Sequence, residues 1–121
     1  QLMLCRELNE LDMAHNKLGA HGAEILLSAL PSDMQKLYLN NCAITHVPSH
    51  AWTCLTKCKG LSVLNLSGNP LDTEDVMVLS YLLPTLPCLL TLDLRDVRMN
   101  GKTRAAIQRS AAVCPCLTCL L

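Results

Sequence analysis

One pattern of apolar and polar positions recurs along the chain at a nearly constant spacing. It reads apolar-x-x-Leu-x-apolar-x-x-polar-x-apolar, and its four copies begin at Leu8, Met34, Leu61 and Leu89. Their first residues lie 26, 27 and 28 positions apart, and a truncated fifth copy is expected 28 positions later, with Leu117 and Leu120. Self-similarity at a fixed period of this length is typical of repeat proteins.

Each copy predicts a short strand followed by a turn and a helix. Successive side chains of a strand point to opposite sides, so the two Leu positions of a copy face inward while the residue between them faces outward. The first helix is expected from about Ala20 to Leu30, ending at Pro31, with Ile25 and Leu26 among its inward residues. The second is the least regular, because Pro48 delays its helix to roughly 51–58.

The third and fourth helices carry their own start and stop signals. Asp72 is a candidate N-cap, followed by Glu74 and Asp75 at the positive end of the helix dipole, and Pro84 ends that helix. Asn100 opens the last helical segment, before Pro115. The units therefore alternate strand and helix through the whole chain.

The repeats predict an α/β solenoid with a curved parallel sheet inside and helices outside. Strands stack about 4.8 Å apart whereas packed helices need roughly 10 Å, so the strand side must be the inner side of the curve. We expect about four full repeats plus a partial fifth in a single domain, residues 1–121. Both ends are apolar where a solenoid needs polar caps, so we expect a fragment of a longer array that self-associates through uncapped ends.

This arrangement resembles the leucine-rich repeat, and a period near 28 with helical connections resembles the ribonuclease-inhibitor-like subtype. The stretch Leu18–Leu30 is the best single match to that subtype, which includes ribonuclease inhibitor, the sensor arms of nucleotide-binding innate immune receptors, Ran GTPase-activating protein and tropomodulin-like actin cappers. The resemblance implies a structural ladder of buried side chains, carried here by Asn16, Cys42 and Asn69. Val97 has no side-chain hydrogen bond to offer at that position, so we expect the fourth turn to be irregular.

The composition argues against two classes of partner, nucleic acids and membranes. Ten basic and ten acidic residues balance, which leaves no general basic surface for nucleic acid. Apolar runs are interrupted by Pro84 and Pro87, so no membrane span is readable and no membrane partner is expected.

The eight cysteines fall mostly in repeat positions, which predicts buried, reduced and structural thiols. Cys5, Cys58 and Cys114 precede a copy by three residues, and Cys88 and Cys116 by one. Disulfides stay open on spacing alone, but the in-register placement argues against them.

Two groups of potential metal ligands occur in the sequence. Strand alternation sends Cys116 and Cys119 of the last cysteine cluster to different faces, which argues against zinc or an iron–sulfur cluster there. A helical stripe of His46, His50, Cys54 and Cys58 is too long for one ion, although His50 and Cys54 could form a partial site. We expect no metal and no cofactor.

No catalytic constellation is readable. The sequence has no nucleophile elbow, no zinc-protease motif and no glycine-rich phosphate loop. Asp12 and Asp93 are three strands apart, roughly 14 Å, which is too far for two carboxylates acting on one bond. We therefore expect a protein that is not an enzyme.

The outward strand positions form the candidate binding site on the concave face. We predict that it consists of Glu10, Asp12, Lys36, Tyr38, Asn40, Asn65, Ser67, Asp93 and Arg95. Tyr and Arg are enriched in binding hot spots, and Tyr38 is the aromatic anchor of this row. The alternative is that these residues form a solvated sheet face that binds no partner.

The sequence thus favours a non-enzymatic protein–protein interaction module that recognises or senses another protein within a larger intracellular protein. The alternative is a regulator of a GTPase or of actin assembly acting through the repeat surface. The expected compartment is the cytoplasm, with the nucleus as the alternative. The identity of the partner is not encoded in any motif, and sensing, substrate choice for a ubiquitin ligase and scaffolding all fit.

Overall fold

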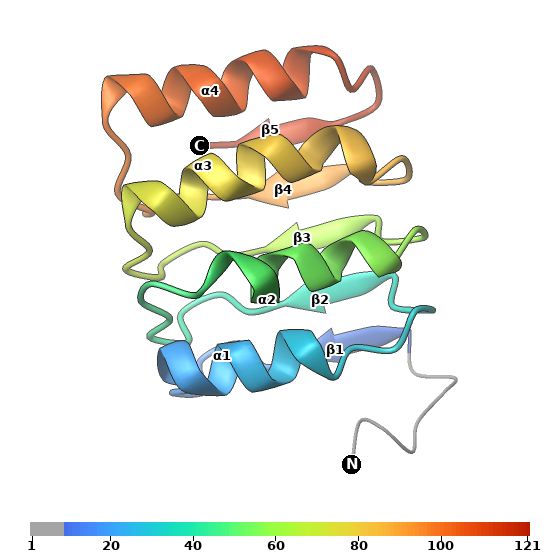
Figure 1. Cartoon of the computed structure of the whole chain (residues 1–121), viewed down its shortest axis with the longest axis vertical. Helices are drawn as coiled ribbons and strands as arrows, with labels where there is room; N and C mark the ends of the chain where they lie inside the picture. The colour runs from blue at the N-terminus through green and yellow to red at the C-terminus, as the bar shows by residue number, and fades with distance from the viewer. Residues whose placement is uncertain (1–8) are drawn as a thin grey trace.

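The computed structural model describes residues 9–121 as alternating strands and helices (Figure 1). Two of the predicted repeat positions, Cys5 and Leu8, lie outside these residues. The strands are β1 (Glu10–Asp12), β2 (Lys36–Tyr38), β3 (Val63–Asn65), β4 (Thr91–Asp93) and β5 (Thr118–Leu120). The helices are α1 (Gly19–Ser28), α2 (Ser49–Thr53), α3 (Thr73–Leu82) and α4 (Gly101–Ala112), with the 3-10 turns η2 (Cys54–Lys57) and η3 (Leu83–Thr85).

The five described strands form one parallel sheet in chain order. Leu11, Leu37, Leu64 and Leu92 lie side by side in register, and all but Leu11 are completely buried. This confirms the register predicted for the four copies. The α/β solenoid architecture is confirmed with it.

The fifth strand differs from the prediction by one residue. Cys119, and not Leu120, pairs with Leu92 in the inward position, and Leu120 pairs with Asp93. The Leu117 N–H donates to the Cys114 carbonyl as the Leu89 N–H does to Leu86, so the turn keeps its register. One residue is then missing between turn and strand, which turns Leu120 to the other face of the sheet.

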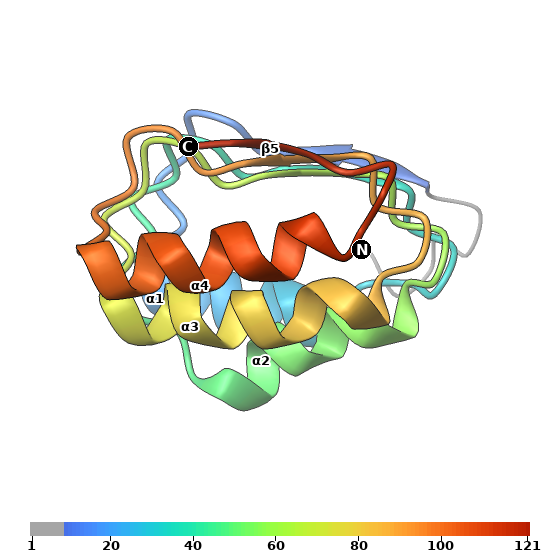
Figure 2. The same cartoon turned by 90° about the horizontal axis from the view of Figure 1, so that it is seen from above.

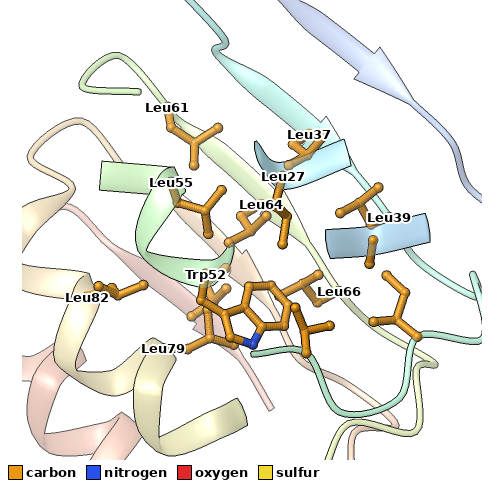
Figure 3. Close-up of a cluster of buried hydrophobic side chains, with 14 of the residues drawn as sticks. Leu27, Leu37, Leu39, Trp52, Leu55, Leu61, Leu64, Leu66, Leu79 and Leu82 are labelled. Carbon is orange, nitrogen blue, oxygen red and sulfur yellow. The ribbon is translucent and has the colours of Figure 1, made fainter. Parts of the chain in front are cut away.

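All the described helices lie on one face of the sheet and leave the other face uncovered by helices (Figure 2). The core between the two layers is built from Leu side chains of every described strand from β2 to β4 and of the helices (Figure 3). Trp52 is completely buried among them, next to Leu66 and Leu79 in the close-up. Trp52 belongs to the short α2, which begins directly after Pro48 at Ser49, two residues before the expected start, and continues as η2 to Lys57.

The helix ends follow the predicted caps more closely than the helix faces follow the predicted pattern. Asp72 and Asn100 both form capping boxes, at α3 and α4. In α1 the buried residues are Ala23, Leu26 and Leu27, whereas Ile25 is 57% exposed, so the expectation that Ile25 faces inward is wrong. Relative to the predicted orientation, α1 is rotated about its axis so that Ala23, Leu26 and Leu27 face the core. Every helix in residues 9–121 is too short or too polar to cross a membrane.

Candidate binding surface on the sheet

The strand register brings the predicted surface residues together in rows on the uncovered side of the sheet, here called the open sheet face. The first row, at the strand starts, comprises Glu10, Lys36, Val63, Thr91 and Thr118. The second row, at the strand ends, comprises Asp12, Tyr38, Asn65, Asp93 and Leu120. Ala14, Asn40, Ser67 and Arg95 each follow the second row by two residues. All the residues predicted for the binding site therefore belong to this face.

Three members of the second row share a local structural task. Asp12, Asn65 and Asp93 each accept the backbone N–H of the residue two positions later, at 2.9, 3.0 and 3.1 Å. Such a side chain replaces the backbone partner that the strand lacks where it ends. Tyr38 occupies the same position in β2 and cannot accept this bond as they do, so its ring is the member of the row best suited to contact a partner.

Asp93 and Arg95 form a fixed ion pair on β4. The Arg95 Nε and Nη2 atoms donate to the two Asp93 carboxylate oxygens at 3.0 and 2.8 Å. These side-chain hydrogen bonds, assisted by the bond from the Arg95 backbone N–H, lower the pKa of the Asp93 carboxyl, against the effect of burial. The expectation that Asp93 is exposed is wrong, because only 4% of it is exposed, whereas its part in binding stays a prediction. Asp93 instead holds Arg95, whose side chain remains 60% exposed.

The ladder behind the surface is carried mainly by Asn69. Its Oδ1 accepts the N–H groups of Cys42 and Ile44, at 2.9 and 3.1 Å, and its Nδ2 donates to the carbonyls of Leu39 and Leu66. These bonds tie the turn of one repeat to that of the next, as expected for a buried amide.

Cys42 and Asn16 fill the equivalent positions differently. The Cys42 thiol donates to the Met13 carbonyl at 3.0 Å, so the sulfur replaces an amide donor, and burial raises its pKa. Asn16 bonds the carbonyls of its own turn, but it is exposed and not buried.

The fourth turn is regular, contrary to expectation. His15, Asn41, Gly68 and Asp96 all have φ between 55° and 70° immediately before the ladder position. Asp96 thus gives the fourth turn the same left-handed residue as the others. Val97 donates its N–H to Leu94 as Asn16 does to Met13, and its side chain is buried. The backbone of the turn therefore does not require the amide.

The seven described cysteines are all free thiols. Cys42 and Cys58 are completely buried, as predicted. Cys88 and Cys116 are exposed, so the expectation of buried thiols is wrong for them. They lie in turns between helix and strand where the chain meets solvent. Cys119 faces the core, and burial raises its pKa to about 11.

A polar cluster that was not recognised from the sequence lies at the start of α3. His46 precedes α2 and does not share a helix with His50, Cys54 and Cys58, so the expected stripe is wrong. His50 instead contacts Glu24 at 3.1 Å. His46 lies against Asp72 and the buried Asp75.

The charges in this cluster influence one another. Burial favours the neutral His46 ring, but the Asp75 and Asp72 carboxylates outweigh it and raise the pKa of His46. Burial likewise opposes ionisation of Asp72, but hydrogen bonds from Asp75 and the charge of His46 lower its pKa. The sequence signal for this cluster was the pair of carboxylates at the cap and the third position of α3. The side chains that contact the pair come from another repeat, so the sequence did not indicate them.

Comparison with known proteins places the fold in a family. Residues 60–82 match the family model of the Leucine Rich Repeat. The chain is a leucine-rich repeat solenoid. The matched segment runs from the turn before β3 to the end of α3, which is one repeat unit of the sheet and helix layers.

This leucine-rich repeat chain is also similar to a curated relative. That relative is a Tonsoku-like protein of Danio rerio, which is 37% identical over 89 residues, or 68% of this chain. The chain spans 6% of the length of that protein. The ribonuclease-inhibitor-like subtype stays a prediction.

Proposed function

We propose that the open sheet face binds a partner protein and that this recognition is the function of the domain. The observation that carries the proposal is the continuous row of outward side chains on five parallel strands, which no helix of residues 9–121 covers. Leucine-rich repeats are in general protein-interaction modules, which supports a non-catalytic role.

The centre of this face offers suitable anchors. Tyr38 is half-buried by its neighbours and presents a large ring at low entropic cost. Arg95 is held by two hydrogen bonds to Asp93, so less side-chain freedom is lost when a partner contacts it. Preorganised Tyr and Arg side chains are typical of the residues that dominate binding energy.

The charge on the face favours a partner with a basic group near β1. Glu10 and Asp12 are exposed there and outnumber Lys36, the neighbour of Glu10 on β2, whereas the Asp93 charge at β4 is neutralised by Arg95. Complementary charges across an interface contribute mainly to orientation and to the association rate. We infer that the partner docks in one orientation, with its basic side toward β1.

We further propose that the domain senses or recruits this partner for a larger intracellular protein in the cytoplasm. The likeness to a much longer relative supports a role as one part of a larger molecule. If the bound partner is a GTPase or actin, its turnover or polymerisation should change on binding, which separates regulation from simple recruitment.

A photo-cross-linking experiment tests the proposed face. A benzoylphenylalanine residue replaces Tyr38 in one sample and Tyr81 in the other, and each protein is irradiated in cell extract. The two positions are the only tyrosines of the chain, and Tyr81 is 71% exposed on α3. We expect a defined protein adduct from position 38 that is absent from position 81. Adducts from position 81 alone would contradict the proposal.

A further inference from the structure

The cluster at the start of α3 brings three potential metal ligands together from two repeats. His46 lies in the segment before α2, whereas Asp72 and Asp75 are the cap and third residue of α3. One ligand atom from each of the three side chains lies within 4.8 Å of the other two. None of the three belongs to the open sheet face.

The distances around His46 differ from those of a charge-assisted hydrogen bond. Its Nδ1 atom lies 3.2 Å from Asp72 Oδ2, 3.3 Å from Asp75 Oδ1 and 3.4 Å from Asp75 Oδ2. A charged N–H···O bond is about 2.7–2.9 Å long, and one proton at Nδ1 serves a single good bond. Ligands that surround a zinc ion at about 2.0–2.1 Å in a tetrahedron lie about 3.3 Å from one another. The spacing between the His46 nitrogen and each carboxylate is that of neighbouring metal ligands.

The charge of the cluster also points to a cation. Asp75 is completely buried, and Asp72 and Glu74 add two more carboxylates around it. Within residues 9–121, His46 is the sole basic side chain in ion-pair contact with Asp72 or Asp75. Buried carboxylates are normally paired with a cation or coordinate a metal.

Hydrogen bonds from outside the cluster fix the buried carboxylate. Asp75 Oδ1 accepts the Val47 N–H and the Trp52 Nε1–H, both at 2.9 Å, and Oδ2 accepts the Asp72 N–H at 3.0 Å. Metal-binding carboxylates are commonly held by such a second layer of donors. The side chains of His46 and Asp72 are each 50% exposed, so the site is open to an entering ion and to water ligands.

We propose that His46, Asp72 and Asp75 bind a divalent transition-metal ion of the zinc class. The imidazole nitrogen and two carboxylates supply three ligands, and water completes the coordination. The ion links the segment before α2 to the start of α3, and so stabilises the contact between the second and third repeats. Because α3 directs its positive dipole end at the site, both carboxylates are needed to offset it.

Zinc chloride added to the reduced, metal-free protein tests the site by NMR. The chain has a single Trp, so one indole N–H signal reports on Asp75, and the ring signals of His46 report on the nitrogen ligand. We expect both sets of signals to shift up to one equivalent of zinc. A His50→Asn control removes a histidine of α2 that contacts Glu24, and should leave this response unchanged.

The variant Asp72→Asn separates metal binding from folding. Asn is as good an N-cap as Asp, so α3 should form, which circular dichroism checks, but one anionic ligand is lost. We expect at least tenfold weaker zinc binding in Asp72→Asn and loss of the Trp52 indole response to zinc in His46→Asn. Unchanged affinity in Asp72→Asn overturns the proposal. The proposal is also overturned if added zinc does not shift the His46 and Trp52 signals, either because zinc does not bind or because thiols bind it instead.

Discussion

Removal of the Asn69 amide should destabilise the fold strongly, because the side chain serves two repeats at once. Asn69 is 1% exposed, and its Oδ1 is the acceptor for the buried N–H groups of Cys42 and Ile44. Its Nδ2 also donates to the carbonyls of Leu39 and Leu66. In Asn69→Ala these four backbone groups lose their partner inside the core.

The expected cost follows from the two N–H groups. An unsatisfied buried donor costs about 1–3 kcal/mol, so the two donors together should lower the free energy of unfolding of Asn69→Ala by about 2–6 kcal/mol. Asn16→Ala is a matched control, since Asn16 holds the same repeat position but is exposed, and it should cost under about 1 kcal/mol.

Urea denaturation followed by far-ultraviolet circular dichroism measures both variants. We expect a large fall in the denaturation midpoint for Asn69→Ala and a small one for Asn16→Ala. Equal midpoints for the two variants, or an Asn69→Ala midpoint near that of the wild type, would refute the ladder as a stabilising element.

Three further predictions concern the core, the acid limit of stability and the thiols. Leu66→Ala should lower the free energy of unfolding by about 2–5 kcal/mol in the same assay, because Leu66 is completely buried between the layers. The pKa of Asp93 is lower in the folded protein than in the unfolded chain. Its contribution to stability is therefore complete above the unfolded pKa and is lost as the pH falls through the folded pKa. Asp93→Asn should accordingly flatten the acid side of a plot of stability against pH. Thiol labelling with mass mapping should modify Cys88 and Cys116 in the native protein and Cys42 only after unfolding; rapid native labelling of Cys42 would contradict its burial.

The strand register could be predicted because it depends on spacing alone. Leu37, Leu64 and Leu92 recur at nearly the period of the repeat, and parallel stacking then places them side by side. The predicted register is wrong at β5, where one residue is missing between the turn at Leu117 and the strand. Because the segment after Leu117 is so short, its Leu pattern does not show whether Cys119 or Leu120 faces the core.

The side-chain partners on the surface were less predictable than the positions. Strand alternation placed Asp93 and Arg95 on one face, but it did not reveal that the guanidinium folds back and buries the carboxylate. The contacts of Asp75 with His46 and Trp52 span 29 and 23 residues and depend on the irregular second repeat. No periodic pattern contains that information.

Binding of the cross-linked partner to the Tyr38→Ala and Tyr81→Ala variants tests the central claim most directly. The dissociation constants are measured by calorimetry with purified proteins of confirmed fold. The account predicts that Tyr38→Ala costs about 2 kcal/mol, or about thirtyfold in affinity, as expected for an aromatic anchor. Tyr81→Ala on the helical side should leave the affinity unchanged. An unchanged affinity for Tyr38→Ala together with a large loss for Tyr81→Ala would place the binding site on the helices and contradict the account.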